Sequence, residues 1–244
     1  MDRLFEIIHE DPELLVINKP AGLVCHPTKG DEFSSLISRV RLHLGNGCPA
    51  HLVNRLDRET SGLVLVAKTD EAARELRRIW ENRRVRKEYR AIVHGRVIPE
   101  SGVIEAALGR DEASRIAIKD RVRNDGAAAR TEFSVLERFT RVEGDFTSLK
   151  VFPQTGRKHQ IRIHLAHLGH PILGDKLYGG DEDLYLALVE DRLTEEQKRR
   201  LILPHHALHA REVRFKWRGR EIAFSAEPEA AFNDFLTDSP AQAS

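Results

Sequence analysis

The residues best suited to chemistry lie in one short stretch, Arg55–Gly62, where an aspartate stands between two arginines. Asp57 precedes a Thr-Ser-Gly turn that leads into a run of aliphatic and β-branched residues typical of a buried strand. Donors from the turn and the neighbouring guanidinium groups favour the ionised carboxylate, so we expect a lowered pKa for Asp57. A carboxylate held in this way is a candidate nucleophile.

Other roles are open for the same residues. Asp57 can cap the turn and pair with Arg55 or Arg58 without any part in catalysis. Glu59 is the obvious second carboxylate, and a pair of acids is what a nucleoside or glycoside hydrolase would use. No cluster of sugar-binding aromatic residues accompanies these two acids. Residue chemistry alone leaves these alternatives unresolved.

Several further segments accompany this stretch. Together the segments are Asn18–Leu23, Arg55–Leu63, Lys87–Ala91, Thr155–Arg162 and Gly169–Asp175. In type and order they resemble the motifs of the pseudouridine synthases that modify large-subunit rRNA and tRNA, and they cover most of residues 5 to 235. The chain departs from that family at Asn54, where histidine is usual, and at Ala127, where lysine is frequent.

The resemblance implies a fold and an activity. The fold would be α+β, with a mixed, mainly antiparallel central sheet, flanking helices and a catalytic cleft across the sheet. The reaction would be isomerisation of a specific uridine in rRNA or tRNA to pseudouridine, with Asp57 as the catalytic carboxylate and no cofactor. A non-catalytic RNA-binding or ribosome-assembly factor of the same fold is the alternative.

The resemblance also implies a set of site residues. Arg162 would pair with Asp57; from the residues alone, an ion pair at the surface is the alternative. Tyr89 would stack on the flipped base; from the residues alone, an aromatic side chain in the core is the alternative. For Lys19, a position near RNA phosphate and a plain surface position are equally open. The expected RNA contacts are Lys19, Arg55, Arg58, Arg110, Arg115, Arg157, Lys158 and Gln160.

Composition indicates a globular protein with a polarised surface. The chain has 244 residues, 41% hydrophobic and 32% charged, and a net charge of only +1, which argues against a general nucleic-acid coat. Locally, residues 74–96 contain nine basic and three acidic side chains, whereas residues 181–200 contain seven acidic and four basic ones. Solvated helix faces on which acidic and basic side chains pair are the alternative explanation of these charged segments. We expect one catalytic domain over residues 1–238 and a frayed tail over 239–244.

Periodicity and capping residues predict the elements that position the site. Expected strands cover 14–18, 63–66, 88–93, 131–136, 148–153 and 207–215. Expected helices cover 34–44, the segment after Thr69, 155–168, parts of the acidic insertion 181–203, and 229–236. A helix beginning at Thr155 would place Arg157 and Lys158 beside free backbone N–H groups, which is a natural phosphate site.

Several classes of protein are excluded or disfavoured. Cys25 and Cys48 are too few and too far apart for a disulfide framework, which fits a reducing compartment. The histidines lack paired cysteines and a His-Glu-x-x-His pattern, so we expect no metal site. No apolar run is long enough to span a bilayer. We expect a cytoplasmic monomer that binds structured RNA and no membrane, with no room before Phe5 for the small RNA-binding domain that many relatives carry.

Overall fold

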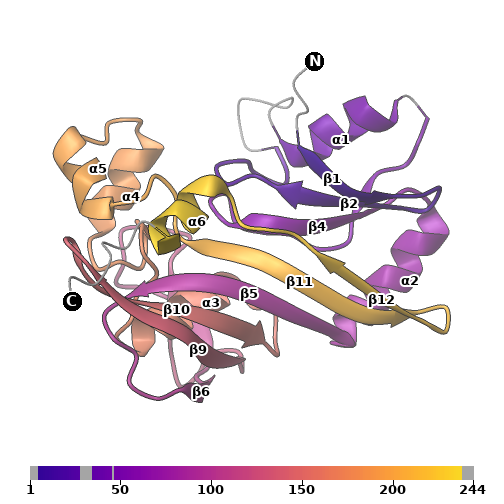
Figure 1. The fold of residues 1–244 in the computed structure, drawn as a ribbon. Coiled ribbons are helices and arrows are strands. Elements are labelled where there is room, and N and C mark those ends of the chain that lie inside the picture. Colours follow the sequence, from indigo (N-terminus) through magenta and orange to yellow (C-terminus); the bar gives the residue numbers. More distant parts are fainter. Residues whose placement is uncertain (1–4, 28–34, 46, 238–244) are drawn as a thin grey trace. The chain divides into compact units, whose positions relative to one another are not determined.

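The computed structural model describes residues 5–27, 35–45 and 47–237, which form two compact units (Figure 1). The first unit joins residues 1–88 to 209–229, and the second joins 89–208 to 230–244. Strand β5 (Val85–His94) runs from the first into the second. The single domain expected over 1–238 stays a prediction, and the expected frayed tail lies outside the described residues.

The first unit is built on a sheet in which β1, β2, β4 and β11 are neighbours in that order. Strand β3 also pairs with β4, and β12 pairs with β11; the β4–β11 pair is parallel and the others are antiparallel. The elements are β1 (Glu6–Glu10), β2 (Leu14–Lys19), α1 (Leu36–Leu44), β3 (His51–Leu52), β4 (Ser61–Ala67), α2 (Asp70–Glu81), β11 (Leu208–Trp217) and β12 (Arg220–Ser225).

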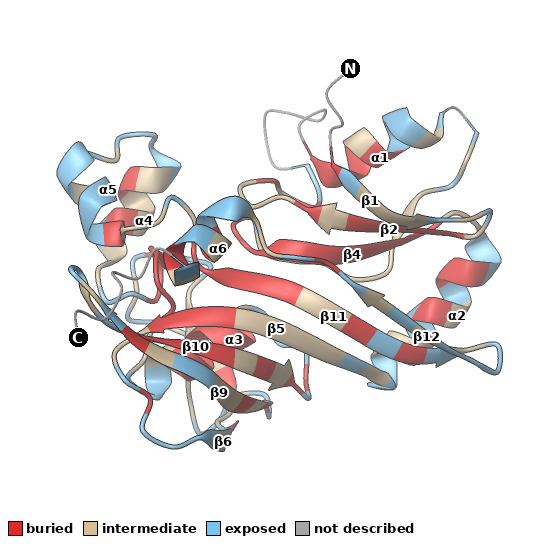
Figure 2. Cartoon of the chain, in the orientation of Figure 1, coloured by how far each residue is buried: buried red, intermediate tan, exposed pale blue. Residues whose placement is uncertain are grey.

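Strand β4 is buried along its whole length (Figure 2). Its residues alternate between two cores: Leu63 and Leu65 share a cluster with Leu76 of α2, whereas Val64 and Val66 share one with Leu36 of α1. Burial on both faces explains why this strand is a continuous aliphatic run instead of an alternating pattern. The strand leading out of the Asp57 turn is therefore packed on both faces.

Helix α2 of the first unit begins where the capping residues predict. The hydroxyl of Thr69 accepts a hydrogen bond from the Ala72 N–H at the start of α2, as expected for an N-cap. Helix α1 begins one residue after its cap, Ser35, and ends before Gly45. The expected start of this helix at Ser34 lies outside the described residues.

The second unit contains the antiparallel strands β5, β10, β9 and β6, paired in that order, and a small β7–β8 hairpin. Its core joins Ile92 and Phe146 of the sheet to Leu165 of α3 and Phe232 of α6. The elements are β6 (Ser101–Glu105), β7 (Leu108–Arg110), β8 (Asp120–Val122), β9 (Arg130–Arg141), β10 (Gly144–Pro153), α3 (Gln160–His167), α4 (Glu182–Val189), α5 (Glu195–Leu201) and α6 (Ala230–Thr237).

The predicted α+β class, with mainly antiparallel strands and flanking helices, is confirmed. The predicted helix start at Thr155 is wrong, because α3 begins at Gln160 after His159, which adopts a left-handed conformation with φ 54°. The acidic insertion forms two helices, α4 and α5, and β12 was not predicted. Among the described residues, no helix is long and apolar enough to cross a membrane.

Candidate active site

Asp57 lies in the loop between β3 and β4, and this loop is anchored on the N-terminal side by Asn54. The Asn54 Nδ2 group donates to the carbonyl of Leu63 at 3.0 Å, and its Oδ1 accepts from the N–H of Leu65 at 2.9 Å. The amide side chain thus pairs with β4 as a strand residue would. Asn54, noted in the sequence only as a departure from the family pattern, is a structural anchor.

A buried thiol holds the residue immediately before Asp57. The Cys25 Sγ lies 3.5 Å from the Leu56 nitrogen and 3.4 Å from the Leu56 carbonyl oxygen, so it accepts from one group and donates to the other. Burial raises the pKa of the Cys25 thiol, which keeps its proton available for the carbonyl. The two residues are 31 positions apart, and no sequence pattern indicated this contact.

A buried lysine holds the residue immediately after Asp57. The Lys19 side chain is fully buried, and its Nζ donates to the carbonyl oxygens of Pro20 at 2.8 Å, Leu23 at 2.9 Å and Arg58 at 3.1 Å. Burial lowers the pKa of Lys19 to about 8, although nearby negative charges, including Asp57, oppose the shift. The plain surface position is therefore wrong for Lys19, and this geometry does not support the predicted RNA contact.

Ser61, at the start of β4, is fixed by a histidine from β11. Its Oγ lies 2.9 Å from His209 Nδ1, and His209 Nε2 lies 3.0 Å from the carbonyl oxygen of Ala226. Because a carbonyl only accepts, Nε2 carries the proton in this bond and the Ser61 hydroxyl donates to Nδ1. Next to this pair, a Cβ on Gly62 would stand 2.4 Å from the Ala210 carbonyl oxygen, so the close approach of β11 requires glycine.

The anchors therefore act at residues 54, 56, 58 and 61, on both sides of Asp57. Asp57 is partly exposed, and the flanking Arg55 and Arg58 are exposed, with Arg58 Nε 3.2 Å from the Gly22 carbonyl oxygen. A carboxylate on a rigid backbone beside exposed guanidinium groups can act as a nucleophile or base toward an anionic substrate.

Arg162 of α3 is held by a two-point ion pair in the second unit. Its Nε lies 2.7 Å and its Nη2 2.9 Å from the two carboxylate oxygens of Asp175, and both side chains are buried. Burial opposes ionisation of Asp175, but the Arg162 charge and hydrogen bonds outweigh it, so the pKa of Asp175 lies well below its usual range. Asp175, the last residue of one family-like segment, thus orients Arg162.

Tyr178 also constrains Arg162, whose Cζ lies 5.0 Å from the centre of the tyrosine ring. Asp57 belongs to the first unit and Arg162 to the second, so their pairing stays a prediction. Tyr89 is partly buried and packs against the core of the second unit, as the core alternative expects. Its stacking on a base also stays a prediction.

Gln160, a predicted RNA contact, is only 3% exposed. Its Oε1 accepts from the Thr155 hydroxyl at 2.6 Å and the Arg157 N–H at 3.0 Å, while Nε2 donates to the Arg130 carbonyl at 3.0 Å and to the Thr131 hydroxyl at 2.9 Å. All its amide hydrogen-bonding atoms are thus used inside the unit. This position does not support an RNA contact, and the Arg157 N–H predicted to be free is occupied.

The remaining predicted contacts of the second unit are exposed. Arg115 pairs with Asp183 at 2.6 Å, and Lys158 pairs with Asp120 at 3.0 Å. The Arg157 side chain donates to the carbonyl of Ala128 at 3.3 Å, and Arg110 lies at the end of β7. Exposure keeps all four available to a ligand, although two of them would have to exchange a carboxylate for a phosphate.

Residues 5–27, 35–45 and 47–237 hold no group of three or more histidine, cysteine or acidic side chains arranged to bind a metal ion.

Comparisons with known proteins agree with the motif order. The family model described as RNA pseudouridylate synthase matches residues 13–167. A Chloroflexus aurantiacus protein named uncharacterized RNA pseudouridine synthase is 44% identical over 66% of this chain and 51% of its own length. The Pseudomonas aeruginosa protein named ribosomal large subunit pseudouridine synthase D is 39% identical over 87% and 67%, respectively.

Among solved structures, human RNA pseudouridylate synthase domain containing 4 is similar with a TM-score of 0.72 and 29% identity, over 94% of this chain and 91% of that one. The chain spans little more than half the length of the first two curated relatives, 51% and 57%.

Proposed function

Because this chain belongs to the RNA pseudouridylate synthase family, we propose that it isomerises a uridine in structured rRNA or tRNA to pseudouridine. The observation that carries the proposal is the anchoring of the loop on both sides of Asp57, by Asn54, Cys25, Lys19 and His209. A turn that needed only a capping carboxylate would not require four separate anchors. A rigid loop is what a reacting carboxylate needs, since small displacements of the reacting atoms are costly.

In the proposed reaction, the bond between the ribose C1′ and N1 of uracil breaks and a bond between C1′ and C5 forms. The proton leaves C5, and N1 ends with a proton, so atoms balance without an oxidant or a leaving group. Asp57 supplies the carboxylate that acts on the sugar or on the base. The enzyme must also retain the detached uracil, for which the Tyr89 ring provides a flat apolar surface.

Arg162 is proposed to place its charge beside Asp57 during the reaction. Its fixed orientation on Asp175 supports this role, because a guanidinium held by two hydrogen bonds and a ring contact loses little freedom on engaging a second carboxylate. Exposed Arg55 and Arg58 would contact phosphates next to the target nucleotide. Selectivity would come from the shape of the RNA and from its splayed loops.

The decisive experiment is Asp57→Asn, which keeps the side-chain shape but removes the charge and the nucleophilic oxygen. We expect no pseudouridine in single-turnover assays with ribosomal RNA and bulk tRNA, with melting temperature and RNA affinity close to those of the unchanged protein. Glu59→Gln, which removes the neighbouring charge and keeps the length of that side chain, would show whether loss of any acid in the loop has the same effect. An active but less stable Asp57→Asn protein would assign the residue to turn capping.

The non-catalytic alternative has its own signature in the same assay. An unchanged protein that binds ribosomal RNA tightly and yields no pseudouridine with any RNA would favour an RNA-binding or ribosome-assembly role.

A further inference from the structure

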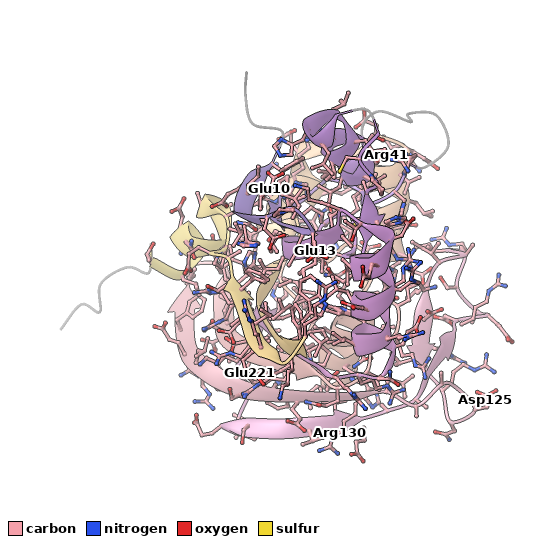
Figure 3. All side chains as sticks on the ribbon, turned by 90° about the vertical axis from the view of Figure 1, so that its right-hand side faces the viewer. Glu10, Glu13, Arg41, Asp125, Arg130 and Glu221 are labelled. Carbon is pink, nitrogen blue, oxygen red and sulfur yellow. The ribbon has the colours of Figure 1, made fainter. Side chains whose placement is uncertain are left out.

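The charged residues of α2 differ in their partners. Glu75 accepts from Arg218 Nε at 2.8 Å and from the indole of Trp217 at 2.6 Å, and Glu71 lies 3.9 Å from Arg218. Arg218 also pairs with Glu13, which is labelled in Figure 3, at 2.8 Å. Glu71 and Glu75 are therefore engaged by the β11–β12 turn.

The arginines of α2 and of the turn after it carry positive charge without a carboxylate partner. We call Arg74, Arg77 and Arg78 of α2, with Arg83 and Arg84 that follow it, the arginine face. All five are exposed, and within the described part of the chain none of them has a carboxylate within 4.0 Å. Glu81, in the last turn of the helix, takes part in no ion pair among those residues. Arginines that served only to balance the helix would be expected to pair with neighbouring acids, as Arg218 does.

The backbone at Arg83 adds a second, independent observation. Helix α2 ends at Glu81 with Asn82 as its C-cap, and Arg83 follows in a left-handed conformation with φ 55°. Glycine is the usual residue at this position because a side chain there is strained. An arginine in such a position sacrifices some stability, which makes its exposed guanidinium group a candidate for a role outside the fold.

The helix dipole explains only part of the pattern. Cations near the C-terminal end of a helix are favourable, and this accounts for Arg78 in the last turn of α2. The dipole effect is confined to the terminal turn, so it gives no reason for Arg74 in the middle of the helix.

We propose that the arginine face binds the phosphate backbone of an RNA stem at a distance from the target nucleotide. The inference deepens the proposed function and rests on it. A stem is favoured over a single strand because single-strand sites combine cations with exposed aromatic rings. Trp80 is the aromatic residue of α2, and it packs edge-on against Phe215 at 5.1 Å in the core of the first unit. The face thus offers guanidinium groups without a stacking platform.

The test compares two triple variants that lose the same charge. The first is Arg74→Ala/Arg77→Ala/Arg78→Ala, in which alanine favours the helix. The second removes Arg192, Lys198 and Arg200 in the acidic insertion, all exposed and paired with carboxylates. The probes are a 16-base-pair RNA hairpin and an oligoadenylate strand of equal nucleotide number. Dissociation constants are measured from about 50 to 200 mM KCl, the range over which phosphate contacts weaken strongly.

For the hairpin, the slope of log affinity against log salt should fall by about two to three units in the arginine-face variant, since each phosphate contact contributes about one. The control variant should keep the slope of the unchanged protein. An equal slope in all three proteins would overturn the proposal, as would a loss confined to the single strand. A loss of binding to anionic lipid vesicles with hairpin binding intact would assign the face to a membrane instead.

The salt-dependence test of the arginine face and the product assay of Asp57→Asn can fail independently of each other. The slopes are measured on RNA that need not contain a target uridine, whereas the proposed function is decided by product formation with Asp57 present or replaced. If the hairpin slope does not change, the proposal that the arginine face binds an RNA stem is wrong and the assignment of Asp57 remains. If the protein forms no pseudouridine, the isomerase is wrong while the slope still reports RNA binding.

Discussion

The loop that carries Asp57 and the helix that carries Arg162 are fixed in different ways. The loop is held through its neighbours, by an amide, a thiol, a lysine and a histidine that bind residues on both sides of Asp57. Arg162 is held directly, by a buried carboxylate that meets its guanidinium group at two points. Loss of a loop anchor should therefore shift Asp57, whereas loss of Asp175 should break a buried ion pair.

The largest expected effect is that of Asp175→Asn in the second unit. Removing the Asp175 charge breaks a buried two-point ion pair, so we expect a loss of about 3–5 kcal/mol in the free energy of unfolding. Urea denaturation measures this change. The control is Asp183→Asn, which removes a carboxylate from an exposed pair in the same unit. A loss below that expected of a surface pair would mean that Arg162 is not desolvated in solution.

The same pair predicts a pH dependence. The pKa of Asp175 is lower in the folded protein than the value of about 3.9 for an unfolded aspartate. Its contribution to stability is therefore complete above that value and is lost as pH falls through the folded-state pKa. The stability difference between the unchanged protein and Asp175→Asn should narrow below about pH 4. Denaturation curves at pH 7 and pH 3 test this; a constant difference would contradict it.

In the first unit, Lys19→Met should have the next largest effect. Methionine keeps the length of the side chain but leaves the carbonyls of Pro20, Leu23 and Arg58 without their buried donor. We expect a cost of roughly 2–3 kcal/mol and a fall in kcat larger than the fall in RNA affinity. Lys68→Met is the matched control, because Lys68 pairs with Glu10, labelled in Figure 3, away from the Asp57 loop. Equal losses in both variants would contradict the anchoring role.

Sequence patterns predicted the elements whose signals are local. The aliphatic run of β4 and the cap of α2 at Thr69 needed only neighbouring residues, and both were confirmed. The start of α3 was wrong because Gln160 is satisfied by Arg130 and Thr131, which are about thirty positions away. The left-handed conformation of His159 separates residues 155–158 from the helix, and nothing near Thr155 in the sequence indicates it.

The anchors of the Asp57 loop were hidden for the same reason. Lys19 is fully buried, although lysine is a surface residue by default, and Cys25 and His209 meet the loop from 31 and 148 positions away. The resemblance therefore predicts which residue reacts, but it does not predict how that residue is held. Positioning depends on long-range contacts that a motif does not contain.

A smaller effect is expected at the pair formed by Ser61 and His209. Ser61→Ala and His209→Asn each break the bond at His209 Nδ1, so both should lower kcat while KM changes little. If Ser61 and His209 act through one bond, the loss of transition-state stabilisation in the double variant should be smaller than the sum of the two single losses. The difference, which is the coupling free energy, should be about 1 kcal/mol or more. Additive losses would mean that the residues affect catalysis separately.

The smallest effect on stability is expected at a predicted RNA contact that already pairs with a carboxylate of the protein. Breaking this pair should strengthen RNA binding. The predicted contact Arg115 is paired with Asp183, and Lys119 and Ser114 from the same loop are bonded to Glu182. Both partners of the Arg115 pair are about two thirds exposed, so breaking it should leave the melting temperature unchanged.

Asp183→Asn frees the Arg115 guanidinium group for phosphate. RNA affinity should therefore rise at low salt and converge with that of the unchanged protein at high salt. Asp234→Asn on α6 is the control for the change in net charge. If both variants strengthen binding equally, the gain reflects overall charge, and Arg115 is not an RNA contact.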